Sequence, residues 1–117
     1  MPAANLFRPL PDARGGERFD DLLNRPGCRI ERIVSHGQAS PPGFWYAQDW
    51  DEWVLLLAGH ALLRLDGEPA PRALAEGDHL LIPAGCRHRV EATAADRPTV
   101  WLAVHLDAPA PPAPAAP

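Results

Sequence analysis

Short apolar runs alternate with turn residues along most of the chain. From Cys28 onward, stretches rich in Ile, Val, Leu and Trp are separated by Gly, Pro or Asp every six to twelve residues. This punctuation predicts short β-strands joined by tight turns. The strands are expected over residues 29–35, 44–48, 52–58, 61–66, 72–74, 79–82, 87–92 and 99–106.

The pattern ahead of these strands has a helical period. Phe19, Leu22 and Leu23 fall at i, i+3 and i+4 within residues 17–24, and Pro26-Gly27 ends the pattern. This spacing predicts one short helix that packs against the domain.

Eight short strands leave no room for helical crossovers, so the expected fold is all-β, a jelly roll or barrel. Residues 108–117 consist only of Ala and Pro, so they offer no side chain large enough to pack. This composition predicts a disordered or polyproline-like tail. We therefore expect an N-terminal arm with the short helix over residues 1–28, a barrel over 29–107 and a tail over 108–117.

Length and charge narrow the class of protein. A chain of 117 residues fits one domain, and its 15 prolines and 9 glycines favour turns over long helices. The net charge is −4 and the arginines are scattered among acids, which argues against a nucleic-acid partner. The N-terminus lacks a basic start followed by an apolar core, and no apolar run approaches the ~18 residues that span a bilayer. We expect a soluble, cytoplasmic protein with no membrane partner, whose two cysteines are free thiols.

The spacing Gly77, five residues, Pro83-x-Gly85, two residues, His88 resembles the second sequence motif of the cupin superfamily. Ala92 stands where that motif has Asn. Two turns at Gly77 and at Pro83 to Gly85 allow His88 to begin a strand that points inward. The resemblance covers residues 29–106 and implies a double-stranded β-helix, the cupin barrel.

The first cupin motif is matched in part: Glu52, six residues and Gly59 match its second half, and Gly43 lies where its opening glycine belongs. Its two histidines are missing. Their places fall on Tyr46 and Gln48 with the three-residue spacing, which we prefer, and on Trp45 and Ala47 with the four-residue spacing. Side chains two residues apart on a strand share one face, so Tyr46, Gln48 and Glu52 are expected around a cavity with His88.

The cupin resemblance implies a metal site of three histidines and one carboxylate, of which this chain supplies His88 and Glu52. Gln48 is a candidate oxygen ligand, and a divalent Fe, Mn, Ni or Zn ion is the candidate cofactor. His105 shares a face with Trp101 and Ala103, and it joins the set if that face points inward. The opposite, apolar face of residues 99–106 has the stronger claim to the core or to a dimer contact.

Without a metal, Glu52 and His88 form a candidate acid and base pair for catalysis. Tyr46, Gln48 and Trp101 are candidate ligand contacts, and Arg87 is a candidate anion contact at the entrance. Trp53 and Trp45 are expected to lie in the interface of a homodimer.

Three functions stay open at this point. The first is a small-molecule-binding cupin with isomerase, lyase or dioxygenase activity that depends on a divalent metal. The second is a non-catalytic metabolite-binding or sensory module. The third is a structural homodimer with a vestigial pocket, since the fold alone does not fix the chemistry.

Overall fold

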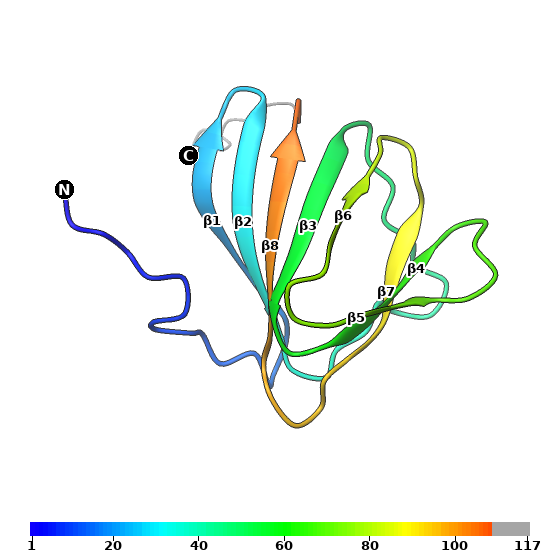
Figure 1. Ribbon diagram of the computed structural model, residues 1–117, viewed down its shortest axis with the longest axis horizontal. Helices are drawn as coiled ribbons and strands as arrows, with labels where there is room; N and C mark the ends of the chain where they lie inside the picture. Colours follow the sequence, from blue (N-terminus) through cyan, green and yellow to red (C-terminus); the bar gives the residue numbers. More distant parts are fainter. Residues whose placement is uncertain (109–117) are drawn as a thin grey trace, which may run out of the picture.

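The computed structural model describes residues 1–108 and places their strands in two antiparallel sheets that face each other (Figure 1). One sheet has five strands in the order β1-β2-β8-β3-β6, and the other has three in the order β5-β4-β7. The strands are β1 (Arg18–Arg25), β2 (Cys28–Ser35), β3 (Asp51–Ala58), β4 (Ala61–Leu65), β5 (Arg72–Leu74), β6 (His79–Ile82), β7 (His88–Thr93) and β8 (Thr99–Leu106). The all-β jelly-roll prediction is confirmed.

Alternation along the central strands builds the core between the sheets. On β3 the even-numbered residues Glu52, Val54 and Leu56 are buried while their odd-numbered neighbours are only half-buried. Side chains of a strand point to opposite faces in turn, so the even face of β3 is the inner one. It packs with inward residues of both sheets, including Leu63 of β4 and Trp101 of β8.

The helix expected within residues 17–24 is wrong, because these residues form strand β1 at the edge of the five-stranded sheet. β1 pairs antiparallel with β2 from Arg18 to Arg25, and the register shifts between Asp21 and Leu23. This β-bulge leaves Leu22 without a partner. The extra residue gives the apolar positions a spacing that imitates a helical turn.

The strand expected over residues 44–48 is replaced by a loop that makes one isolated bridge. The Tyr46 amide donates to the His88 carbonyl at 2.8 Å, and the His88 amide donates back to the Tyr46 carbonyl at 3.0 Å. The prolines and glycine just before Phe44 break the ladder on that side. The other seven expected strands correspond to β2 through β8, with shifts of one residue at some ends.

The N-terminal segment covers part of the outer face of the larger sheet. Ala13 is buried there with Val34 and Val100, and Leu6 and Leu10 pack against this second cluster. None of residues 1–108 belongs to a helix long and apolar enough to cross a membrane. The expected disorder of the Pro/Ala tail concerns residues that, apart from Ala108, lie outside the described part of the chain.

Candidate ligand pocket of the barrel

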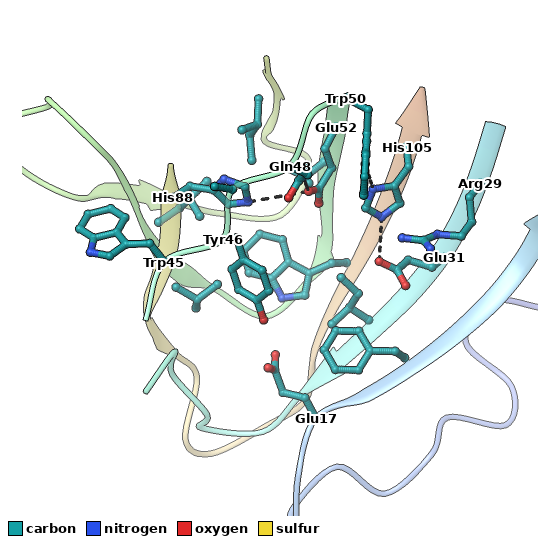
Figure 2. Close-up of a pocket in the computed structure, with 18 of the residues that line it drawn as sticks. Glu17, Arg29, Glu31, Trp45, Tyr46, Gln48, Trp50, Glu52, His88 and His105 are labelled. Atoms are coloured by element: carbon teal, nitrogen blue, oxygen red, sulfur yellow. Dashed lines mark hydrogen bonds and ion pairs between the residues drawn. The ribbon is translucent and has the colours of Figure 1, made fainter. Parts of the chain in front are cut away.

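A cavity of about 500 Å³ opens between the two sheets (Figure 2). Its walls combine ionisable side chains with a set of aromatic rings. The ionisable and amide-bearing residues are Glu17, Arg29, Glu31, Gln48, Glu52, His88 and His105. The aromatic residues are Phe19, Phe44, Trp45, Tyr46, Trp50 and Trp101.

Glu52 and His88 meet in this cavity, as the motif spacing predicts. The Nε2 atom of His88 lies 3.7 Å from Oε1 of Glu52, and both residues are buried. Nδ1 of His88 lies 3.0 Å from the carbonyl oxygen of Cys86. A carbonyl can only accept, so Nδ1 carries a proton and Nε2 is the ring nitrogen that faces Glu52.

The loop before β3 brings Tyr46 and Gln48 to the same place. The Gln48 amide donates a hydrogen bond to Oε1 of Glu52. The Tyr46 ring stacks on the imidazole of His88, with centroids 5.6 Å apart and planes at 22°. The backbone bridge between Tyr46 and His88 therefore fixes one wall of the cavity and holds the Tyr46 ring against the imidazole.

His105 also points into the cavity, so the expectation that the apolar face of β8 forms the core is wrong. Trp101, Ala103 and His105 are buried, whereas Leu102 and Val104 are half-buried on the outer face. The pairing of His105 with Glu52 and of Ala103 with Val54 dictates this, because directly paired residues share a face. Both faces of β8 are apolar enough that its sequence alone does not decide between them.

The two ring nitrogens of His105 are already engaged. Nε1 of Trp50 donates to Nδ1 at 2.9 Å, and Nε2 lies 2.9 Å from Oε1 of Glu31. An indole nitrogen can only donate, so Nδ1 is the acceptor and Nε2 is the protonated atom that donates to the carboxylate. His105 thus holds Glu31 and Trp50 in place.

Sequence reasoning missed several polar residues of the cavity. Arg29 and Glu31 alternate with outward residues on β2, and Glu17 immediately precedes β1. The side-chain period of two on residues 29–35 could have indicated the first pair. The misassigned helix hid Glu17.

The family model described as the cupin domain matches residues 31–105. The chain belongs to the cupin family. Among curated proteins, no sequence matches this cupin at a significant level.

Solved structures extend the comparison over nearly the whole chain. A crystal structure of a "putative mannose-6-phosphate isomerase" from Ralstonia eutropha is 52% identical to this cupin, with a TM-score of 0.88, and the match covers 92% of this chain and 100% of the other. KdgF from Halomonas sp. is 18% identical, with a TM-score of 0.70 over 90% of this chain and 91% of the other. The DMSP lyase DddQ from Ruegeria pomeroyi is 21% identical, with a TM-score of 0.66 over 89% of this chain and 54% of the other. The last two similarities concern the fold alone.

The remaining expected contacts of this cupin lie in different places. Trp101 forms part of the cavity wall. Arg87 is exposed, lies outside the lining and pairs with Asp66 at 3.5 Å. Its guanidinium also stands 5.0 Å from the ring of Trp45, which lines the cavity rim. Arg87 therefore contacts a residue of the cavity wall without lining the cavity itself, and its role as an anion contact at the entrance stays a prediction.

The donor set of this cupin does not fit a tightly held transition metal. Within residues 1–108, no group of three or more His, Cys, Asp or Glu side chains is arranged to hold a metal ion. Glu52 and His88 supply two donors, and Gln48 adds at most a weak amide oxygen. His105 uses both ring nitrogens for Trp50 and Glu31.

Proposed function

We propose that this cupin binds a small organic molecule in its barrel and that Glu52 and His88 move a proton on it. The observation that supports the proposal is the fixed tautomer of His88. Because Nδ1 donates to the Cys86 carbonyl, Nε2 is the atom left to accept or return a proton beside the Glu52 carboxylate. Both groups line a cavity large enough for a small metabolite.

The pair can act in two complementary ways on a ligand that carries a carbonyl group. The pair does this when it holds one proton between Glu52 and Nε2 of His88. The unprotonated member then takes a proton from the carbon next to the carbonyl, and the protonated member gives its proton to the carbonyl oxygen, so that an enediol or enol forms. Return of a proton to the former carbonyl carbon completes an isomerisation. Loss of a leaving group from the carbon β to the carbonyl completes an elimination. The name of the Ralstonia eutropha structure agrees with the first of these reaction types.

Isomerase or lyase chemistry therefore suits the pair better than dioxygenase chemistry. A dioxygenase of the cupin type needs a bound redox metal, and the donors around Glu52 fall short of such a site.

The test follows exchange of carbon-bound hydrogen with solvent. Small hydroxy ketones, oxo acids, amino ketones and aldoses are incubated with the protein in D₂O, and loss of the proton next to the carbonyl is followed by NMR. We expect exchange with wild type in the presence of EDTA. We expect a loss of about 100-fold or more in Glu52→Gln and in His88→Gln, which is typical when a general acid or base is removed.

Asp49→Asn serves as the matched control, because this exposed loop carboxylate does not line the cavity. Exchange that survives in both pair variants, or that disappears with EDTA and returns with an added metal, would contradict the proposal.

A non-catalytic binding module is the second candidate, and the Gln48 bond to Glu52 favours it. The Gln48 amide holds the Glu52 carboxylate in one position by a hydrogen bond. Both side chains can then offer their remaining polar atoms to a ligand without any transfer of a proton. A ligand that stabilises wild type in thermal unfolding but undergoes no exchange would support this candidate over the enzyme.

A further inference from the structure

The charges of the cavity are strongly unequal. Three carboxylates line it, those of Glu17, Glu31 and Glu52, against the single guanidinium of Arg29. Within residues 1–108, none of the three carboxylates lies within 4.0 Å of an arginine. Glu17 accepts from the Ser35 hydroxyl, Glu31 lies beside His105, and Glu52 lies beside His88 and accepts from the Gln48 amide. His105 adds no positive charge, because its Nδ1 accepts a hydrogen bond from Trp50. The carboxylates therefore outnumber the permanent positive charge of the cavity by three to one.

The three carboxylates surround one point of the cavity. Burial raises the pKa of the Tyr46 phenol above its ordinary value of 10.0, and the negative charges of Glu17, Glu52 and Glu31 raise that pKa further. Figure 2 shows the Tyr46 hydroxyl directed toward Glu17, with Glu52 and Glu31 on the other sides of the ring. A ligand beside Tyr46 therefore lies among three negative groups.

Aromatic rings supply the rest of the wall around this point. Six of them line the cavity, and the Tyr46 ring lies edge-on to Phe44 with centroids 4.9 Å apart. Ring faces attract cations through their quadrupole, most strongly where water is excluded. Aromatic walls combined with carboxylates that no arginine neutralises are the chemistry that recognises an organic ammonium group.

We infer that the ligand of this cavity carries a positively charged nitrogen, in an amine or quaternary ammonium group held among Glu17, Glu31 and the aromatic wall. The inference rests on the proposed function to the extent that this cavity is the ligand site. It departs from the phosphate in the name of the Ralstonia eutropha structure. A phosphate dianion would meet three carboxylates and only one arginine.

Arg29 bears on the choice of ligand, because its Nε atom is buried without an acceptor. In the ladder between β2 and β8, Arg29 is the backbone partner of His105. Its side chain lies on the same face of β2 as that of Glu31. Its charge offsets one carboxylate at that end of the cavity. One guanidinium against three carboxylates does not reverse the sign of the cavity.

Three ligands of similar shape distinguish the effect of ligand charge from the effect of ligand shape. They are choline, its uncharged isostere in which carbon replaces the ammonium nitrogen, and tert-butylacetate, an anion with the same apolar head. Binding is measured by tryptophan fluorescence and by calorimetry. We expect choline to bind about tenfold or more tightly than the uncharged isostere, with tert-butylacetate the weakest of the three.

Glu17→Gln tests a carboxylate that does not belong to the proposed proton-transfer pair. The glutamine oxygen can still accept from Ser35, so the variant removes charge with little change in shape. We expect it to weaken choline about three- to tenfold and to leave the uncharged isostere unchanged. Asp96→Asn removes an equal charge outside the cavity and should change neither affinity.

Equal affinity for choline and the isostere, or no binding of either, would overturn the inference. Tighter binding of tert-butylacetate, lost in Arg29→Gln, would assign the cavity to anions instead. These outcomes are separate from the proposed function, which stands or falls on hydrogen exchange in Glu52→Gln and His88→Gln. A protein that exchanges hydrogen only on anionic carbonyl compounds would keep the function and reject the ammonium ligand.

Discussion

Tyr46 is the only tyrosine of the chain, so its titration can be observed without interference from another phenol. Its pKa is raised first by burial and then by the three cavity carboxylates. The phenolate is thus less favourable in the folded protein than in the unfolded chain. Folding stability associated with this group is present below pH 10 and is lost as the pH rises through the folded-state pKa.

We expect the phenolate absorbance of folded wild type to appear at a higher pH than that of the unfolded chain. Glu17→Gln should shift the midpoint partly back, because one of the charges that oppose ionisation is gone while burial remains. Ultraviolet titration checks both statements, with Asp96→Asn as the control. A midpoint that Glu17→Gln leaves unchanged would contradict the placement of Glu17 beside the phenol.

Glu52 and His88 could be predicted as cavity residues because the spacing of the cupin motifs indicates where they lie. Gly77, Pro83 and Gly85 set two turns, and these fix where the strand of His88 begins. The role of His105 could not be predicted in the same way. It depends on Trp50 and Glu31, which lie 55 and 74 residues away in the sequence, and no local pattern links these residues.

Among the turns, the one between β3 and β4 shows how closely two elements can depend on one glycine. Gly59 has a φ of +88°, and a Cβ atom there would lie 2.4 Å from Oγ1 and 2.7 Å from Cα of Thr99, at the start of β8. Gly67, in the next turn, also has a φ of +88°, but nothing lies within 4 Å of its Cβ position.

We expect Gly59→Ala to destabilise the fold more than Gly67→Ala. Positive φ costs both alanines roughly 1–2 kcal/mol. Overlap with backbone atoms adds roughly 1–3 kcal/mol at Gly59 alone. Urea unfolding of the two variants measures the difference, and equal midpoints would show that β8 does not lie this close to the turn.

At the same scale, the sequence identifies most strands but not the first. Periodicity on β3 agrees with its pairing, since Glu52, Val54 and Leu56 face the core. On β1 the bulge at Leu22 breaks the alternation, so the local pattern favoured a helix. Pairing with β2 decides the matter, and that pairing is a long-range contact that no window of β1 contains.

Across the whole molecule, the outer face of the larger sheet carries a continuous apolar row. Leu23, Ile30, Val104, Trp53 and Leu81 are consecutive partners across β1, β2, β8, β3 and β6. Each of them is exposed or half-buried. The N-terminal segment covers a different part of this face, near Val34 and Val100.

We propose that a second copy of the chain covers this row, as the position of Trp53 suggests. Sheet faces that bury an apolar row exclude water from both copies, whereas an isolated charge placed there would be desolvated without a partner. Leu81→Arg, at a side chain that is 50% exposed on the row, should therefore convert a dimer into a monomer. Leu62→Arg, at a side chain that is 39% exposed on the smaller sheet, should leave the dimer intact. Sedimentation over a range of concentrations distinguishes these outcomes, and a wild type that stays monomeric throughout, or a dimer lost only in Leu62→Arg, would place the interface elsewhere or nowhere.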